Sequence, residues 1–262
     1  MKYSLLVRTD ALVLCIFLCL GMIVMFIIGR SIKKYFRFEE DEPKGSIGMI
    51  QTGLFGLFGF ILAFTFGMSG TRFDNLRGLL IDESNTIGTA ILRSDLYSDS
   101  VRKEFRNQFR EYLDGRINAY TKFRDTAFTL AIKNKTDAAA SRLWSLAMSE
   151  SKLPNMLVPS NQMVPALNQM FDAAASRDTL LRSKTPEAII FMLLVLALVS
   201  SFIAGVTSGP IGRREWMIIS CFFLFNAMIV YITLDLGRPL RGIIKTRAAE
   251  KSFIDLRMML KD

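Results

Sequence analysis

The sequence of 262 residues contains no histidine and only three cysteines. Histidine is the commonest metal ligand and the commonest general base near neutral pH, so its absence argues against most zinc sites and most acid–base catalysis. The cysteines, Cys15, Cys19 and Cys221, all lie in apolar stretches, which predicts neither a disulfide framework nor a metal site. A P-loop, a dinucleotide-binding glycine motif and a nucleophile elbow are missing as well. We therefore predict a protein that is not an enzyme and uses no metal or cofactor.

What the sequence does contain is four long apolar windows, each with roughly the 17 to 25 residues that a membrane-spanning helix needs. They are Ala11–Gly29, Ile47–Gly67, Ala188–Val206 and Trp216–Leu236. The first window is retained as a helix of the mature protein, because no small-residue cleavage pattern follows it and a basic flank begins at Arg30. The predicted fold is an all-α membrane protein with four transmembrane helices and a helical soluble region between the second and third spans.

This arrangement predicts three regions: a transmembrane hairpin in residues 1–70, a helical soluble region in residues 71–185, and a second hairpin with a basic tail in residues 186–262. The net charge is +9. Its basic excess lies near the ends of the apolar windows, which favours contact with anionic lipid headgroups over contact with nucleic acid. We predict a multi-pass protein of a bacterial inner membrane. The basic tail favours a cytoplasmic soluble region, whereas Arg30, Lys33 and Arg213 favour the opposite orientation.

The second apolar window is rich in glycine and phenylalanine. Small residues recur at spacings of three and four along one stripe of the helix, which suits either close packing of another helix or the lining of a pore. The phenylalanines could form a hydrophobic constriction in such a pore, although side chains of this type more often face lipid or fill a helix bundle. The constriction predicted on the pore hypothesis consists of Phe60, Phe64, Gly56, Gly59 and Ala63.

The same helix is predicted to continue beyond the membrane, at least to Leu96. Its apolar positions keep a helical spacing from Phe73 to Ala90, and Glu83 falls on that apolar face. A carboxylate there must be paired or hydrated, so we expect a partner such as Arg72 or Arg77 from a neighbouring helix, in a structural ion pair or along an ion path. The polar groups predicted to line a vestibule are Arg72, Asp74, Arg77, Glu83 and Asn85.

Further helices are expected in the soluble region. Residues 100–123 form an amphipathic pattern whose buried face includes Phe105, Phe109, Tyr112 and Arg116. A helix is expected over Ala138–Ser151, capped by Thr136 or Asp137 and ended by Pro154. Another is expected from Ala166, because Pro159 and Pro165 break up the preceding stretch. Three polar residues are predicted at the membrane edge after the last span: Asp235, Arg238 and Arg241.

Several of these blocks resemble the bacterial and plant bestrophin-like family of small membrane proteins. The blocks are Leu62–Phe64, Arg72–Asp74, Asp82–Ala90 with Arg93 and Leu96, Ala166–Asp172 with Arg177, and Leu234–Leu236 with Arg238–Pro239 and Arg241–Gly242. The resemblance implies a distant relation to bestrophins, which are oligomeric channels whose second membrane helix lines a hydrophobic neck. Gly59–Phe60 followed by Thr71–Phe73 is similar to the neck motif, with a gap about one helical turn longer and an acid at position 74.

The sequence leaves three functions open. The leading hypothesis is a homo-oligomeric ion channel, a pentamer that conducts chloride or another anion if the bestrophin relation holds, with the second helix lining the pore. Its partners would be the lipid bilayer and inorganic ions. The alternative is a non-conducting membrane scaffold or signalling protein that binds a partner through its soluble region. The third is a coupled transporter in which Glu83 or Asp235 carries a proton.

Overall fold

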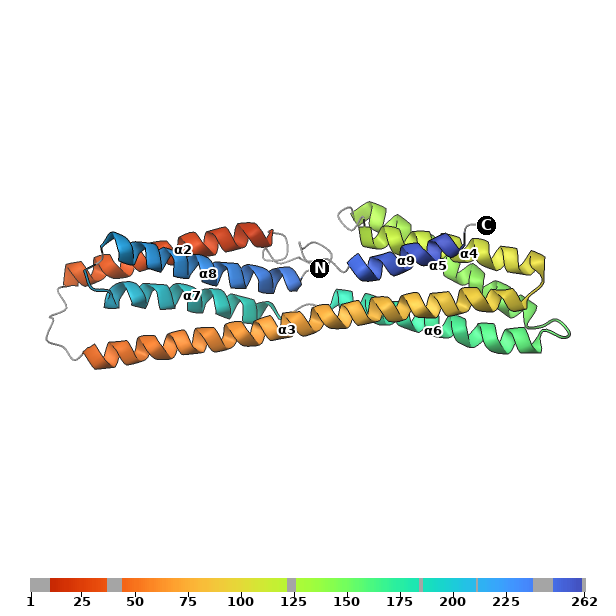
Figure 1. The fold of residues 1–262 in the computed structure, drawn as a ribbon, viewed down its shortest axis with the longest axis horizontal. Helices are drawn as coiled ribbons and strands as arrows, with labels where there is room; N and C mark the ends of the chain where they lie inside the picture. Colours follow the sequence, from red (N-terminus) through yellow and green to blue (C-terminus); the bar gives the residue numbers. More distant parts are fainter. Residues whose placement is uncertain are drawn as a thin grey trace. The chain divides into compact units, whose positions relative to one another are not determined.

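The computed structural model describes residues 10–36, 44–121, 126–183, 186–210, 212–237 and 247–260. All of its regular elements are helices (Figure 1): α2 (Ala11–Phe36), α3 (Lys44–Arg93), the short 3-10 turn η1 (Ser94–Leu96), α4 (Asp99–Thr121), α5 (Thr126–Glu150), α6 (Leu157–Arg182), α7 (Glu187–Thr207), α8 (Arg213–Leu236) and α9 (Arg247–Met259). Because these described ranges contain no strand, the predicted all-α fold is confirmed.

Four segments are long and apolar enough to cross a membrane. They are Ala11–Tyr35 in α2, Gly48–Leu96 in α3 and its short extension, Leu157–Thr207, and Arg213–Leu236 in α8. The third segment joins α6 to α7, and its long uncharged stretch, Ala188–Val206, belongs to α7. The predicted four spans are thus confirmed.

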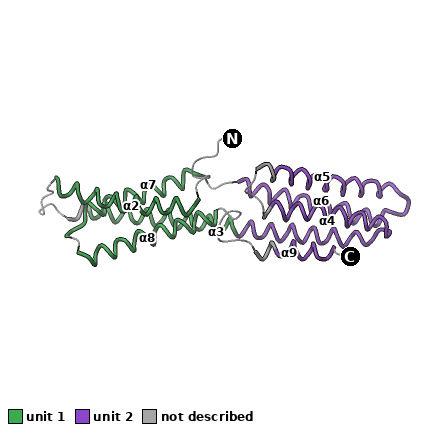
Figure 2. Tube along the Cα trace, turned by 90° about the horizontal axis from the view of Figure 1, so that it is seen from above, with its two compact units in different colours: residues 1–73, 184–238 green, residues 74–183, 239–262 purple. Residues whose placement is uncertain are grey.

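The chain divides into two compact units, coloured separately in Figure 2. Unit 1 comprises Met1–Phe73 and Lys184–Arg238, and unit 2 comprises Asp74–Ser183 and Pro239–Asp262. The boundary falls inside α3, so this one helix contributes its first part to unit 1 and its second part to unit 2.

In unit 1, α2 packs against both α7 and α8. Phe26 of α2 is fully buried, and its ring meets Trp216 and Phe223 of α8 edge-on, with ring centroids 5.7 and 5.9 Å apart. The closest approach between α2 and α7 is made by two glycines. A Cβ on Gly29 would lie 2.1 Å from the carbonyl oxygen of Phe202, and a Cβ on Gly205 would lie 2.1 Å from that of Phe26. These backbones are too close for any larger residue.

Gly205→Ala is therefore expected to destabilise unit 1 by about 1–3 kcal/mol, the usual cost of overpacking. The matched control is Gly67→Ala on α3, where an added Cβ has no neighbour within 4 Å among the residues that the structure describes. This control is expected to be neutral or to gain up to about 1 kcal/mol from the better helix propensity of alanine. Thermal unfolding of the detergent-solubilised protein measures both. A comparable loss in Gly67→Ala would instead indicate a close neighbour of α3 that the described residues do not provide.

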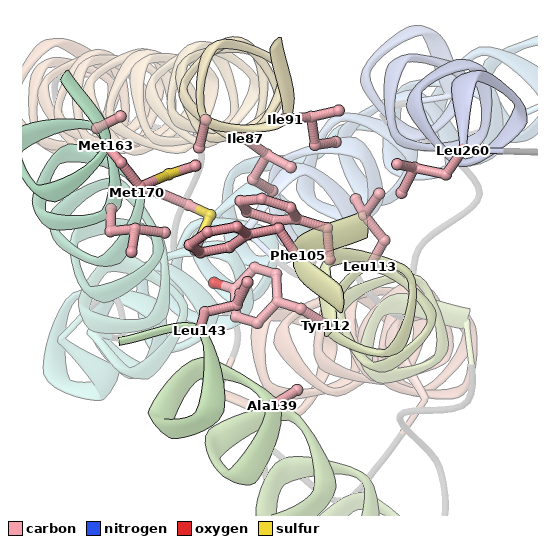
Figure 3. Close-up of a cluster of buried hydrophobic side chains, with 14 of the residues drawn as sticks. Ile87, Ile91, Phe105, Tyr112, Leu113, Ala139, Leu143, Met163, Met170 and Leu260 are labelled. Carbon is pink, nitrogen blue, oxygen red and sulfur yellow. The ribbon is translucent and has the colours of Figure 1, made fainter. Parts of the chain in front are cut away.

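In unit 2, side chains from several helices meet in one hydrophobic core. Figure 3 shows Ile87 of α3 together with Phe105 and Tyr112 of α4, Leu143 of α5 and Met170 of α6. All of them are buried. The second part of α3 is thus one helix of this bundle, with one face buried in its core.

Two predicted boundaries are wrong. The helix expected from Ala138 begins at Thr126, because residues 126–137 contain no glycine or proline to stop it. Thr136, the expected cap, lies inside α5, where its hydroxyl donates to the carbonyl of Ile132. The helix expected from Ala166 begins at Leu157 and includes both prolines. Pro159 falls in the first turn, where a backbone N–H needs no helical partner.

The carboxyl-terminal tail, for which the sequence predicted only basic character, contains α9. This helix packs on α4. Arg257 of α9 donates from Nε and Nη2 to the two carboxylate oxygens of Asp114 on α4, at 2.6 and 3.2 Å. Phe253 and Leu260 add buried apolar contacts to the core of unit 2. The tail is therefore a structural part of unit 2.

Candidate functional site

One narrow stripe of α3, which we call the seam, faces the rest of the chain. Its members are buried and follow one another at spacings that return to the same side of a helix: Phe58, Leu62, Thr65, Ser69, Leu76, Leu80, Glu83, Ile87 and Ala90. The seam runs through both units. The remainder of the helix surface is largely exposed, apolar in the membrane part and polar beyond it.

The five residues of the predicted constriction all lie off the seam and are exposed. Phe60 is 70% exposed and Phe64 is 58% exposed. Within the described part of the chain, a Cβ added to Gly56 or Gly59 would meet nothing within 4 Å. Of the two interpretations of the small-residue stripe, packing within the described chain therefore finds no support in these positions. Lining a pore, contacting a second copy and contacting lipid all remain open to them.

Gly59 also lies at the edge of a cavity. With Phe55, Phe58, Phe222 and Asn226 it lines an open cavity of about 390 Å³ in unit 1. The rings of Phe55 and Phe222 are 5.8 Å apart in an edge-on arrangement, which brings α3 beside α8. The contact between these two helices is thus made by aromatic side chains rather than by the glycines.

The predicted vestibule residues fall into two groups. Asp74, Arg77 and Asn85 are exposed and Arg72 is partly buried, whereas Glu83 is 0% exposed. At the predicted membrane edge, Asp235 is buried in unit 1. Its two companions in that prediction, Arg238 and Arg241, lie outside the described residues.

Glu83 is the centre of a buried network of charged side chains in unit 2. Arg116 of α4 donates from Nε to Glu83 Oε1 at 2.5 Å. Arg177 of α6 brings Nη1 to 2.9 Å from Glu83 Oε2. This second contact is an ion pair without hydrogen-bond geometry, since Glu83 Oε2 and Arg177 Nε both lack a hydrogen-bond partner within the described ranges. One carboxylate on α3 thus holds guanidiniums from two other helices.

Asp178 completes this network and makes it electrically neutral. Arg116 donates to its two oxygens at 3.2 and 3.3 Å, and Arg177 Nη2 lies 3.4 Å from Oδ1. Burial would raise the pKa of Asp178, but the neighbouring guanidiniums of Arg116 and Arg177 outweigh burial and hold that pKa below its usual value. The side chain of Asp178 is partly exposed, so the network reaches the surface of unit 2 there.

The two arginines differ in how well their charge is compensated. Burial alone would lower the pKa of Arg116, but the carboxylate of Glu83 beside it raises that pKa above its ordinary value. For Arg177 burial dominates, and the like charge of Arg116 adds to it, so its pKa is lowered. Arg177 also has the weaker contact geometry. It is the less well satisfied cation of the pair.

The expected partners of Glu83 were wrong, since the arginines in contact with it are Arg116 and Arg177 rather than Arg72 or Arg77. A sequence signal for Arg116 existed, because it shares the apolar face of its helix with Phe109 and Tyr112. A buried cation on one helix and a buried acid on another are natural partners. For Arg177 the sequence offered only its place in a family-like block.

Tyr112 lies beside the network, and burial raises its pKa to about 12. Because the folded protein holds this proton more tightly than the unfolded chain does, the resulting stability is complete below pH 10. It is lost as the pH rises from 10 through 12, by about 2–3 kcal/mol. In Tyr112→Phe, the decline of unfolding free energy over that interval is expected to be shallower by this amount. Denaturant unfolding at pH 9, 10, 11 and 12 measures it; parallel declines in both proteins would contradict the assignment.

Fold and site together define an all-α membrane protein in which one long helix joins a membrane bundle to a soluble bundle. The chain belongs to the Bestrophin-like family, because the model of the Bestrophin-like domain matches residues 15–250. The family resemblance predicted from the sequence is confirmed. No curated protein matches the chain.

Solved structures show the same fold. A crystal structure of a bacterial Bestrophin homolog from Klebsiella pneumoniae matches with a TM-score of 0.63 at 14% sequence identity, covering 93% of this chain and 98% of that one. A point-mutated form of the homolog matches with a TM-score of 0.67 at 14% identity, covering 96% and 99%. At this identity the likeness extends to the fold alone.

Proposed function

We propose that this protein is a homo-oligomeric ion channel of a bacterial inner membrane, in which copies of α3 surround a central pore. The observation that carries the proposal is the exposed apolar face of α3. Gly29 and Gly205 are used for packing between α2 and α7, whereas a Cβ on Gly56 or Gly59 would have no described residue within 4 Å. A small-residue helix face without an internal partner is available to line a pore or to contact another copy.

The order of residues along this face suits a conduction path. Phe60 and Phe64 would form a hydrophobic constriction, which can gate by excluding water. Asp74 and Asn85 follow Ala63 at intervals of about three helical turns, so the three share one side of α3. The constriction would therefore open into a vestibule with exposed polar groups, to which Arg77 contributes from the same side of α3. Arg72 lies about half a turn round the helix from Ala63, beside the seam, and is partly buried. Glu83 is assigned a structural role, since its carboxylate is enclosed by two arginines.

Family membership and the likeness in fold to a bacterial Bestrophin homolog support this proposal. By that relation the assembly would be a pentamer and the conducted ion chloride or another anion. Asp74 is a reason to test cations with equal care, because a ring of carboxylates favours cations.

The direct test is to record purified protein in planar bilayers under a KCl gradient and to image the same particles in nanodiscs. Single-channel currents, from a ring of subunits with α3 at the axis, are the expected result. The sign of the reversal potential then gives the selectivity. Absence of current in potassium, sodium and chloride salts, together with a monomeric particle, would refute the channel.

A non-conducting scaffold is the second candidate, favoured by one observation in unit 2. Leu153, Leu157 and Val158, at the turn between α5 and α6, are large apolar side chains that are strongly exposed. Exposed apolar groups of this kind suit a protein partner. A stoichiometric partner that co-purifies with the chain, combined with a particle that has no central opening, would favour this function over the channel.

A further inference from the structure

One end of the bundle of α2, α7 and α8 carries basic side chains at the level where the apolar helices stop. The uncharged stretch of α2, Ala11–Gly29, is about 28 Å long, close to the thickness of the hydrocarbon core of a bilayer. Arg30 follows immediately. On α8, Arg213 and Arg214 stand just before Trp216, whose ring packs on Phe26 of α2. The basic residues of both helices therefore lie at the depth of the lipid headgroups.

Arg30 is held firmly in place. The glycine contacts between α2 and α7 surround it, and a Cβ on Gly205 would lie 3.1 Å from the backbone nitrogen of Arg30. Its guanidinium Nη1 is buried and has no hydrogen-bond partner among the residues that the structure describes. A buried guanidinium N–H without an acceptor is unfavourable. Arg30 as a whole is partly exposed, so a rotation of its guanidinium would bring Nη1 to an oxygen outside the chain.

Lys33 lies one turn further along α2 and reaches the link between α7 and α8. Its Nζ donates to the carbonyl oxygen of Ser208 at 2.7 Å, which uses one of the three N–H donors of an ammonium group. Arg213 and Arg214 are exposed in the first turn of α8. The nearby acid, Glu215, is engaged in accepting the backbone N–H of Gly212 at 2.8 Å. Among the described residues, the acid nearest in sequence to Arg213 and Arg214 is thus occupied in capping its own helix.

We propose that Arg30, Lys33, Arg213 and Arg214 bind the phosphate headgroup of an anionic phospholipid. Guanidinium and ammonium groups are the usual partners of phosphate oxygens, and the positive end of the α8 dipole adds to the attraction. The membrane is the source of the phosphate because apolar side chains continue the site below the cations. Ile27 of α2 and Ile218 of α8 are both strongly exposed and offer contact to acyl chains. A free phosphate would leave that apolar surface unused.

Native mass spectrometry and thermal unfolding of the full chain, with phosphatidylglycerol, cardiolipin or phosphatidylcholine added to the detergent, test the site. The two anionic lipids are expected to remain bound and to raise the unfolding temperature more than phosphatidylcholine does. Each of the exchanges Arg30→Gln, Arg213→Gln and Arg214→Gln is expected to weaken anionic-lipid binding about fivefold. The matched control is Lys152→Gln, which removes one exposed cation from unit 2 and is expected to leave lipid binding unchanged.

Arg213 and Arg214 are exposed, so their variants test the site even if Arg30→Gln fails to fold. Inorganic phosphate at millimolar concentration separates the two possible sources of the ligand. Equal stabilisation by phosphate alone would overturn the lipid assignment, as would equal binding of phosphatidylcholine and phosphatidylglycerol. Binding that is unchanged in all the arginine variants would overturn the site itself. None of these outcomes depends on whether the protein conducts ions.

Discussion

Glu83→Gln is expected to destabilise unit 2 by about 3–5 kcal/mol, the range seen when one partner of a buried ion pair is removed. The exchange keeps the size of the side chain but deletes the charge that Arg116 and Arg177 share. Both guanidiniums stay buried, at 8% and 3% exposure. Asp178 is left as the single carboxylate in contact with both of them within the described residues. The network would then carry an uncompensated positive charge in the interior.

Unfolding of unit 2 can be read separately from that of unit 1. The chain has two tryptophans, Trp144 and Trp216. Trp144 packs beside Phe171 in unit 2, with ring centroids 6.5 Å apart. In a Trp216→Phe background, fluorescence therefore reports on unit 2 during denaturant unfolding. The matched control is Asp82→Asn, which removes the same charge from the neighbouring, exposed position and is expected to change stability by less than about 0.5 kcal/mol.

A double substitution separates charge from packing. Arg177 is the less well satisfied cation, so Glu83→Gln combined with Arg177→Met removes one charge of each sign and leaves Arg116 paired with Asp178. The double variant is expected to be more stable than the sum of the two single losses by at least about 1 kcal/mol, because groups in one network couple. Two results would show that the network does not hold the three helices together. One is a loss of stability in Glu83→Gln as small as that in Asp82→Asn, and the other is a double variant whose loss equals the sum of the two single losses.

Glu83 also shows how far sequence reasoning reaches. Its place on the apolar face of α3 follows from local spacing, and so does the need for a compensating partner. The identity of that partner depends on which helices pack against α3, and Arg116 and Arg177 come from distant parts of the chain. Helical periodicity contains no information on such packing. Burial of a cation on α4 was predictable by the same rule, but joining it to Glu83 required the tertiary structure.

The glycine stripe of α3 shows a different limit. Four spans and an all-α fold could be predicted, because uncharged windows of that length have few other solutions. Whether a stripe of small residues packs within the chain depends on which helices lie beside it, and the sequence does not give this. The structure places the tight contacts at Gly29 and Gly205 instead, two glycines that carried no special signal in the sequence. The glycine content of the sequence pointed to α3 as the site of close helix packing, whereas the closest backbone contacts lie between α2 and α7.

If α3 lines the pore, replacing Phe60 and Phe64 together by alanine is expected to raise single-channel conductance at least about tenfold, a lowering of the barrier by ~1.4 kcal/mol. Two rings of phenylalanine side chains exclude water from a narrow path, and removing them allows hydrated ions to pass. Because both side chains are exposed in the subunit, their loss leaves no cavity in its core. The change in conductance can thus be measured on a folded protein.

The control that decides this prediction is Phe17→Ala, compared with Phe60→Ala alone. Phe17 of α2 is 69% exposed, nearly the same as Phe60 at 70%, and it also lies within an apolar span. Phe17 and Phe60 lie on different helices but are almost equally exposed. A difference in conductance between their alanine variants therefore cannot be due to exposure. A rise in conductance confined to the α3 variant would assign its face to the conduction path. Equal behaviour of the two variants would instead place Phe60 and Phe64 against lipid, and the pore would have to be sought on another helix.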